Sequence, residues 1–270
     1  MQRNDRMRVA LTIAGSDSGG GAGIQADLKT FQMLGVFGTS AVTAVTAQNT
    51  LGVRGVYPIP PEGVAAQIDA VLEDLGADAA KTGMLVHAEL IAVVAERVRY
   101  HRLDRLVVDP VMVAKGGTRL LEPDAERALR DLLLPLAFVV TPNAPEAEAL
   151  TGLRVTDRRS QERAAEMLVR ELGARAAVVK GGHLDGPPVD VLFDGREWTY
   201  LEGERIATRH THGTGCTFSA ALAAELAKGR PLDEAVRTAK AFVTAAVRRV
   251  PGIGGGHGPI NHWAYAEDKR

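Results

Sequence analysis

The sequence has a single cysteine, few aromatic residues and almost no net charge. Aromatic residues make up 4% of its 270 residues, and 32 lysines and arginines nearly balance 33 aspartates and glutamates, which leaves a formal net charge of −1. One cysteine excludes an intrachain disulfide and a metal cluster held by several thiolates. Balanced charge gives no bulk attraction to nucleic acid or to a membrane surface. A phosphate would therefore have to be bound by local geometry.

Long apolar runs are missing as well. No run reaches the ~20 residues that a membrane-spanning helix needs, and the polar, basic segment 1–8 lacks the apolar centre of a signal peptide. Apolar residues still make up 46% of the chain, enough for a sizeable core. We expect a cytoplasmic protein with no membrane or nucleic-acid partner. We expect one domain over residues 1–270, with a flexible tail at 1–8.

Apolar, β-branched segments alternate with helical patterns over most of the chain. This alternation predicts an α/β fold, with a central, mostly parallel sheet covered by helices on both faces. The expected strands are 9–14, 40–47, 77–82, 105–109, 138–141 and 176–180. The expected helices among them are 23–34, 61–75, 88–100, 123–133, 145–150 and 160–172. A hairpin over 189–201, a further strand at 206–209 and helices at 215–228 and 232–249 complete the pattern.

Polar or glycine clusters follow six of the expected strands. In open α/β sheets, ligands bind in the crevice beyond the carboxyl ends of the strands, so these clusters predict one site there. The clusters are Gly15-Ser16-Asp17, Gln48-Asn49, Thr82-Gly83, Asp109-Pro110, Thr141-Pro142-Asn143 and Lys180-Gly181-Gly182.

The segment THGTGCTFS at 211–219 carries the most specific chemistry. Its two glycines let the backbone approach a ligand, and an alanine- and leucine-rich helix begins at once. The free N–H groups of that first turn and the positive end of the helix dipole predict an anion site over Gly213, Thr214, Gly215 and Cys216. Cys216 is a candidate base, and we expect the helix N-terminus to lower its pKa from the usual ~8.5. Phosphate binding beside a base indicates phosphoryl transfer.

Glycine-rich residues 19–23 follow the first expected strand. The pattern GAGIQA at 21–26 imitates a dinucleotide-binding fingerprint, which also needs an acid about 20 residues further on. That region reads TAQN at 46–49, with no acid, so we reject a nicotinamide site. A Gly-x4-Gly-Lys-Ser/Thr loop is absent too. We expect a ligand-covering loop here rather than a plain packing turn.

Four polar residues at strand ends each have a structural and a functional interpretation. Asn143 and Glu146 suit a helix cap, but they also suit Mg²⁺, held directly or through water. Asp109 could join that metal network or simply form a turn before Pro110. Lys180 could extend along apolar surface or reach a phosphate.

Gln48 also has two interpretations, because a Gln-Asn pair suits a turn and an amide suits a flat heterocycle. A glutamine can bond an amino group and the adjacent ring nitrogen at once, as it does with adenine, for ~1–3 kcal/mol of discrimination. The seven histidines lack the i, i+4 helical spacing of a metalloprotease site. We expect His210, His212, His257 and His262 to be solvated or structural.

Seven motifs together resemble the hydroxymethylpyrimidine/phosphomethylpyrimidine kinases of thiamine biosynthesis, within the ribokinase superfamily. The resemblance extends from Ala10 to about His262. The motifs are AGSDSGGGAGIQADLKT (14–30), TAVTAQNT (43–50), KTGML (81–85), VVDPVM (107–112), TPNAPEA (141–147), VVKGGH (178–183) and THGTGCTFSAALAA (211–224).

The resemblance implies a ribokinase-like fold, a homodimer and a kinase that uses ATP and Mg²⁺. Such an enzyme phosphorylates the hydroxymethyl group of 4-amino-5-hydroxymethyl-2-methylpyrimidine, and then converts the monophosphate to the diphosphate. It implies a ring site with Gln48 as the pyrimidine-binding amide, surrounded by Gly15, Asp27, the Thr46 backbone and Met84. It also implies an anion hole at Gly213–Cys216, with Cys216 where sugar kinases carry an aspartate base. The remaining roles it implies are a metal-linked pair, Asn143 and Glu146, and a nucleotide-phosphate contact, Lys180.

One departure and three alternatives remain. Some relatives carry a lysine in the glycine-rich tail where this chain has Gly255, although His257 lies nearby. A pyridoxal or pyridoxine kinase is the nearest alternative, but a pyridine lacks the amino-plus-nitrogen edge that suits Gln48. A non-catalytic pyrimidine-binding protein is the second. A cysteine hydrolase using Cys216 and His212 is the third, and the closeness of the two residues in sequence opposes it.

Overall fold

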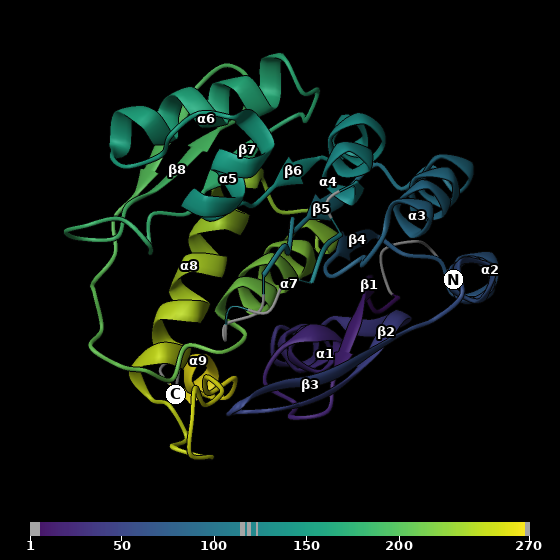
Figure 1. The fold of residues 1–270 in the computed structure, drawn as a ribbon, viewed down its shortest axis with the longest axis horizontal. Coiled ribbons are helices and arrows are strands. Elements are labelled where there is room, and N and C mark those ends of the chain that lie inside the picture. The colour runs from purple at the N-terminus through teal and green to yellow at the C-terminus, as the bar shows by residue number, and fades with distance from the viewer. Residues whose placement is uncertain (1–5, 114–116, 118–119, 123, 268–270) are drawn as a thin grey trace.

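The computed structural model describes residues 6–113, 117, 120–122 and 124–267. One nine-stranded sheet runs through it in the order β3-β2-β1-β4-β5-β6-β7-β8-β9 (Figure 1). Strands β2, β1, β4, β5, β6 and β7 run parallel to one another, whereas β3 at one edge and β8 and β9 at the other pair antiparallel. The strands are β1 Val9–Asp17, β2 Phe37–Asn49, β3 Gly52–Pro58, β4 Ala79–Thr82, β5 Leu106–Val108, β6 Val139–Val140, β7 Ala177–Val179, β8 Asp190–Phe193 and β9 Trp198–Leu201. The predicted, mostly parallel α/β architecture is confirmed.

Helices cover both faces of the sheet. One face packs against α1 (Gly23–Met33), α7 (Thr214–Ala227) and α8 (Leu232–Arg248). The other face packs against α2 (Pro61–Asp74), α3 (Ala88–Tyr100), α4 (Ala125–Ala128), α5 (Ala144–Thr151) and α6 (Arg158–Arg170). A short helix, α9 (Ala264–Glu267), lies against α8. None of the helices in the described part of the chain combines the length and apolar character that crossing a membrane requires.

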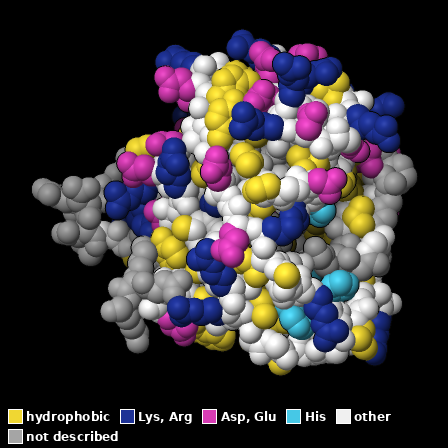
Figure 2. Space-filling model, turned by 90° about the vertical axis from the view of Figure 1, so that its left-hand side faces the viewer, with side chains coloured by type: hydrophobic (Ala, Val, Ile, Leu, Met, Phe, Trp, Pro, Cys, Tyr) yellow, Lys and Arg dark blue, Asp and Glu magenta, His cyan; other side chains and the backbone are white. Residues whose placement is uncertain are grey.

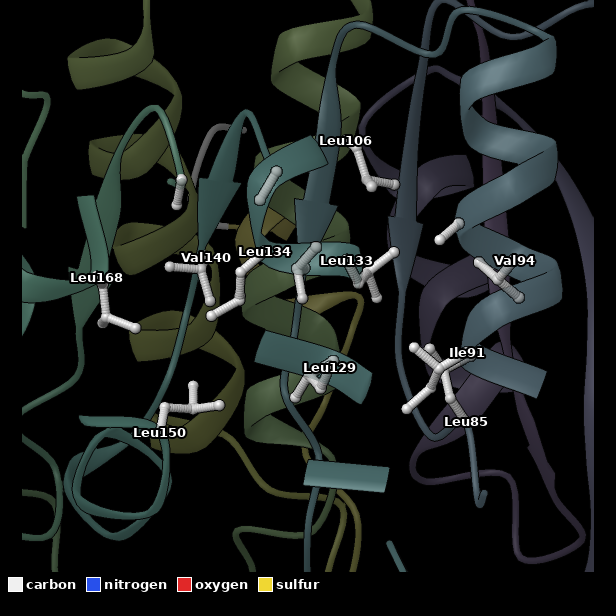
Figure 3. Packing of buried hydrophobic residues seen from close by; sticks show 14 of the residues in the cluster. Leu85, Ile91, Val94, Leu106, Leu129, Leu133, Leu134, Val140, Leu150 and Leu168 are labelled. Carbon is white, nitrogen blue, oxygen red and sulfur yellow. The ribbon is translucent and has the colours of Figure 1, made fainter. Parts of the chain in front are cut away.

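The core follows from the strands' alternating side chains. In β1, Leu11 and Ile13 point to the face covered by α2–α6, while Ala10 joins the core under α1 and α7. Figure 3 shows part of the largest apolar cluster, in which Leu106 of β5 and Val140 of β6 lie among leucines and valines from the covering helices. Because the central strands are buried on both faces, their sequences read as nearly continuous apolar runs.

Three elements differ from the prediction. The expected helix at 123–133 is the short α4 followed by a π-helical turn, Leu129–Leu133, and a 3₁₀ turn, Leu134–Leu136. The described residues 206–209 form no strand. Strand β3 was not predicted, because its sequence GVRGVYP has two glycines, an arginine and a proline. Of the expected N-terminal tail, 1–5 lie outside the described residues, and Arg6 and Arg8 each bond Asp78.

Candidate active site

A cavity of about 610 Å³ lies beyond the carboxyl ends of the strands. Its walls come from the ends of β1, β2 and β4, the residues after β5, β6 and β7, and the start of α7. All six predicted polar strand ends contribute at least one residue, and the Thr82-Gly83 cluster contributes its glycine. Figure 2 shows one face of the molecule, where acidic and basic side chains are interspersed and histidines gather in one area. The cavity lies where the sequence predicts a site.

The first turn of α7 has the geometry predicted for an anion site, and we call Gly213–Cys216 the anion turn. Gly213 precedes the helix with φ of 85°, and a Cβ there would collide with the carbonyl oxygen of Gly21. Only glycine fits this left-handed, crowded position. No described side chain caps the helix, and its first turn contains no acidic residue. The backbone amides of Gly215 and Cys216 are therefore available to an anionic ligand.

Lys180 and Asp109 face this turn. A Cβ on Gly215 would lie 3.6 Å from Lys180 Nζ and 3.8 Å from Asp109 Oδ2, so the glycine keeps space open between them. Lys180 Nζ is 3.5 Å from Asp109 Oδ1, and the Ser219 hydroxyl donates to Asp109 Oδ2 at 3.1 Å. Burial works against the charged ammonium, but Asp109 and Glu146 raise the pKa of Lys180 above its usual value. A fixed cation therefore lies beside the anion turn.

Asn143 and Glu146 form the capping box of α5, so the structural interpretation of this pair is correct. The backbone N–H of Glu146 donates to Asn143 Oδ1 at 2.9 Å, and the N–H of Asn143 donates to Glu146 Oε2 at 2.8 Å. Both residues also line the cavity. Burial raises the pKa of Glu146 to about 7; the nearby Lys180 opposes this shift and Asp109 adds to it. The segment Asn143–Glu146 thus caps α5 and also forms part of the cavity wall.

The residues near Lys180 suit a hydrated magnesium ion. Across the described residues, no group of three or more His, Cys, Asp or Glu side chains is arranged to hold a metal by itself. Mg²⁺, however, usually takes one or two carboxylates, several waters and substrate phosphates. Glu146 and Asp109 supply two carboxylates in one cavity, and the anion turn supplies a phosphate site. The donor set therefore fits a metal brought in with a nucleotide.

Cys216 lines the cavity, but its ionisation differs from the prediction. Burial raises the pKa of its thiol to about 12, and Asp27 and Asp109 add to the effect. The Lys81 ammonium and a hydrogen bond from the Gly23 backbone oppose the shift. The expectation that the helix N-terminus lowers this pKa is wrong, because loss of solvation outweighs the helix dipole. Cys216 is a neutral thiol at physiological pH.

A second part of the cavity contains most of the residues predicted to surround a ring. Gly15, Thr46, Gln48 and Met84 all line it. A Cβ on Gly15 would collide with the methyl group of Met84, so this glycine lets the thioether lie over the cavity. The carboxamide of Gln48 lies 3.1 Å from the Thr46 hydroxyl. An amide, a thioether and a bare backbone together suit a flat heterocycle.

Asp27 departs from the prediction. It is fully buried and is not among the described residues that line the cavity. Its carboxylate pairs with Lys81 at 3.1 Å and accepts from the Thr12 hydroxyl at 2.6 Å. The placement gives no support to a direct contact between Asp27 and a ring. The Lys81–Asp27 pair instead supports the floor next to Cys216, because both ions contribute to the field at that thiol.

His212 and Asp17 had no individual role in the kinase site predicted from the sequence. His212 Nε2 lies 2.8 Å from Asp17 Oδ2 and 3.4 Å from Gln48 Nε2, and both residues line the cavity. Their positions in the sequence could have identified them as site residues, because Asp17 belongs to a polar strand end and His212 directly precedes the anion turn. The tail position Gly255 and the nearby His257 are not among the described lining residues; His257 Nδ1 lies 3.1 Å from the Arg209 carbonyl oxygen.

Comparison with known proteins agrees with this geometry. The family model described as phosphomethylpyrimidine kinase matches residues 17–261. The chain belongs to the phosphomethylpyrimidine kinase family. It is 56% identical to a hydroxymethylpyrimidine/phosphomethylpyrimidine kinase of Haemophilus influenzae, over 96% of this chain and 98% of the relative. A kinase of the same description from Bacillus subtilis is 54% identical over 95% of each chain.

Solved structures of this kinase family and its relatives share the fold. A Bacillus subtilis pyridoxal kinase in complex with ADP superimposes with a TM-score of 0.90 at 44% identity, covering 97% of this chain and 99% of that one. A phosphomethylpyrimidine kinase from Clostridium difficile gives 0.80 at 42% identity, covering 89% and 99%. The ribokinase-like fold and the kinase class expected from the sequence are confirmed. The kinase class replaces the alternative of a cysteine hydrolase, and His212 Nε2 bonds Asp17 at 2.8 Å.

Proposed function

We propose that this kinase transfers the γ-phosphoryl group of ATP to the hydroxymethyl group of 4-amino-5-hydroxymethyl-2-methylpyrimidine, and then phosphorylates the monophosphate to the diphosphate. The observation that carries the proposal is that one cavity contains both the residues suited to a phosphate and the residues suited to a flat ring. The anion turn at Gly213–Cys216 and the Lys180 ammonium lie on one side, and Gln48 and Met84 lie on the other. The relatives that match over the whole chain are named for these two activities.

The chain's own residues would act mainly by positioning and charge neutralisation. Phosphoryl transfer passes through a loose transition state whose charge lies on the peripheral oxygens. The amides of Gly215 and Cys216 would donate to these oxygens, and Lys180 would neutralise charge on the nucleotide. Asp109 holds the Lys180 ammonium in place and keeps it charged. Donors fixed before the reaction stabilise the transition state without reorganising.

Mg²⁺, brought in with ATP, would be held through Glu146 and Asp109, chiefly through water. Both oxygens of Asp109 and one oxygen of Glu146 are already engaged with protein groups, which favours water-mediated contact. The ion would neutralise phosphate charge. Deprotonation of Glu146 would accompany metal binding, because its buried carboxyl has a pKa of about 7.

Cys216 would orient the substrate hydroxyl rather than remove its proton in advance. A thiol with a pKa of about 12 is almost wholly protonated at neutral pH. A loose transition state leaves little need for early deprotonation of the nucleophile. The hydroxyl would therefore donate its hydrogen bond to Cys216 Sγ in the ground state. Its proton would pass late, to an oxygen of the transferred phosphoryl group, as the new P–O bond forms and the bond between that phosphorus and ADP breaks.

Replacing Gln48 with alanine tests the proposal. We expect pyrimidine binding to weaken by roughly 5- to 150-fold, corresponding to the ~1–3 kcal/mol of a bidentate amide contact, with ATP affinity within about twofold of wild type. Titration calorimetry with each ligand separately measures both effects. Intact pyrimidine affinity in this variant would overturn the assignment of Gln48.

A pyridoxal kinase of the same type is the second candidate. It is favoured by the structural similarity to pyridoxal kinases, including a Staphylococcus aureus enzyme with AMP-PCP and pyridoxal at a TM-score of 0.88 and 38% identity. Parallel assays with the aminopyrimidine and pyridoxal decide between them, and we expect the higher kcat/KM for the aminopyrimidine. A single domain, a homodimer and a cytoplasmic location remain predictions from sequence.

A further inference from the structure

His212 links three segments around the cavity that are distant in sequence. Its ring lies against the glycine-rich loop, where a Cβ on Gly21 would come within 2.6 Å of His212 Cδ2. Its Nε2 lies 2.8 Å from Asp17 at the end of β1 and 3.4 Å from the Gln48 carboxamide at the end of β2. Its backbone continues directly into Gly213 of the anion turn. The side chain is only 11% exposed, so this placement is well packed.

Asp17 determines which ring nitrogen of His212 carries the proton. Its carboxylate accepts backbone N–H groups from Gly19 at 2.8 Å, Gly21 at 3.1 Å and Ala22 at 2.9 Å. Burial raises the pKa of Asp17, but the His212 hydrogen bond and these amides outweigh it and hold the pKa below its usual value. An ionised carboxylate can only accept hydrogen bonds. His212 Nε2 must therefore bear a proton and donate it to Asp17.

That donor fixes the direction of the Gln48 amide. A protonated Nε2 has no lone pair to accept an N–H, and its hydrogen, already donated to Asp17, repels an NH₂ group. The amide end 3.4 Å away must therefore be the carbonyl oxygen, which reverses the placement of Gln48 Nε2 toward His212. The Thr46 hydroxyl points to the same answer. It has one proton to donate, but the Ser16 carbonyl oxygen lies at 3.0 Å and the second end of the Gln48 amide, placed as Oε1, at 3.1 Å. Both contacts are satisfied only if that amide end is an NH₂ group that donates to the hydroxyl. The two ends of a carboxamide have the same shape, so hydrogen-bond chemistry decides between them.

One orientation satisfies every group. With the Gln48 oxygen toward His212 and the NH₂ toward Thr46, the oxygen faces the edge of the Nε2 hydrogen that His212 donates to Asp17, the NH₂ donates to the Thr46 hydroxyl, and that hydroxyl donates to Ser16. One lone pair and one N–H of the amide remain for a ligand. These match the amino group and the neighbouring ring nitrogen of an aminopyrimidine.

We propose that His212, held as an Nε2–H donor by Asp17, sets the direction of the Gln48 amide and thereby the direction in which the pyrimidine binds. This inference rests on the proposed function. The amide oxygen lies at the His212 end, next to the anion turn, so the 4-amino group binds at that end. The hydroxymethyl group on the adjacent carbon then points toward Gly213–Cys216. The reversed amide would place the hydroxymethyl group on the Thr46 side, away from the phosphoryl group. His212 is a positioning residue, not a catalytic one.

The test compares His212→Leu, which removes the donor, with His212→Gln, which restores an N–H at the position of Nε2. A matched control is His101→Leu, because His101 is also 11% exposed and its Nε2 lies 2.6 Å from a carboxylate, Asp69, outside the described cavity lining. Substrates are the 4-aminopyrimidine and its analogue without the amino group. Circular dichroism and ATP binding establish that each variant is folded.

Wild type must first phosphorylate the aminopyrimidine; if it does not, the proposed function fails and not the role of His212. We then expect His212→Leu to lower kcat/KM for the aminopyrimidine at least about tenfold and to reduce the preference over the analogue without the amino group, with ATP KM nearly unchanged. His212→Gln should recover most of the preference, and His101→Leu should match wild type. In a Gln48→Ala background, His212→Leu should add little further loss.

Equal losses on both substrates, or additive losses with Gln48→Ala, would overturn the proposal. If His212→Leu fails to fold, Asp17→Asn takes its place. A lower preference for the aminopyrimidine in Asp17→Asn, restored when His212→Gln is added, supports the proposal against a packing role. An unaffected preference in Asp17→Asn overturns it.

Discussion

At the scale of single residues, burial changes the chemistry that residue types suggest. Cys216 lies at a helix N-terminus, which alone would favour a thiolate, yet its surroundings raise the thiol pKa to about 12. Glu146 lies in a capping box, which alone would favour a carboxylate, yet burial raises its pKa to about 7. Both shifts depend on neighbours from other segments, so neither could be predicted from the local sequence.

The pKa of Cys216 predicts how it reacts with iodoacetamide. With a pKa of about 12, its thiolate fraction at pH 8 is ~10⁻⁴, and it should rise about tenfold per pH unit up to at least pH 10. The alkylation rate of the folded protein, measured by mass spectrometry, should follow that slope without levelling off. The same cysteine in the chain unfolded by denaturant is the control, and its rate should level off near pH ~8.5. Levelling off near that pH in the folded protein would show that the thiol is activated.

At the scale of elements, the anion turn depends on the contact between the α7 N-terminus and the glycine-rich loop after β1. Gly213 combines a φ of 85° with close approach to the Gly21 carbonyl. The loop is in turn held by the three backbone hydrogen bonds to Asp17. Two segments almost 200 residues apart thus form one wall of the cavity, as the separation of 195 residues between His212 and Asp17 illustrates.

Gly213→Ala should therefore damage both catalysis and stability. The added methyl group displaces the turn, and losing one oxyanion donor typically costs ~10²–10³ in kcat. Steady-state kinetics and thermal melting measure the two effects. Gly76→Ala is the matched control, since Gly76 has a φ of 68° and no atom within 4 Å of its added Cβ. It should cost on the order of 1–3 kcal/mol in strain while keeping kcat. A similar loss of kcat in both variants would contradict the role of the turn.

The elements show what sequence can and cannot predict. Strands β1, β4, β5, β6 and β7 were predictable because parallel strands buried on both faces are continuous apolar runs. Strand β3 was missed because it is a partly exposed edge strand with little apolar character. Cavity-lining strand ends such as Lys180 and Gln48 were found because ligands gather at that edge of the sheet. His212 was missed because its meaning depends on its partners, and Asp27 was misplaced because a sequence does not reveal burial behind the cavity floor.

At the scale of the whole molecule, the C-terminal segment is joined to the active-site helix through a buried histidine. His262 Nε2 lies 3.0 Å from the Thr217 hydroxyl in α7, and the residue is 4% exposed. Burial lowers its pKa from 6.5 to about 4, with a small contribution from Lys29. Below its unfolded pKa, the unfolded chain binds a proton that the folded chain excludes, so folding should weaken as pH falls.

The free energy of unfolding should thus decrease by up to about 3 kcal/mol through His262 alone between pH 6.5 and pH 4. Denaturant unfolding at several pH values measures this. Other groups titrate in the same window, so His262→Gln is the comparison: its stability relative to wild type should improve progressively as the pH falls through that range. A constant difference between the two proteins would contradict a buried, neutral His262.

The central claim is that the anion turn and Gln48 hold the two substrates in one cavity. A crystal structure with AMP-PCP and the aminopyrimidine tests it most directly. We predict that γ-phosphonate oxygens lie within hydrogen-bond distance of the Gly215 and Cys216 amides, and that the amino group and ring nitrogen of the pyrimidine meet the Gln48 carboxamide, with the hydroxymethyl group toward the turn. A phosphate tail bound away from Gly213–Cys216, or a pyrimidine bound without Gln48, would contradict the account.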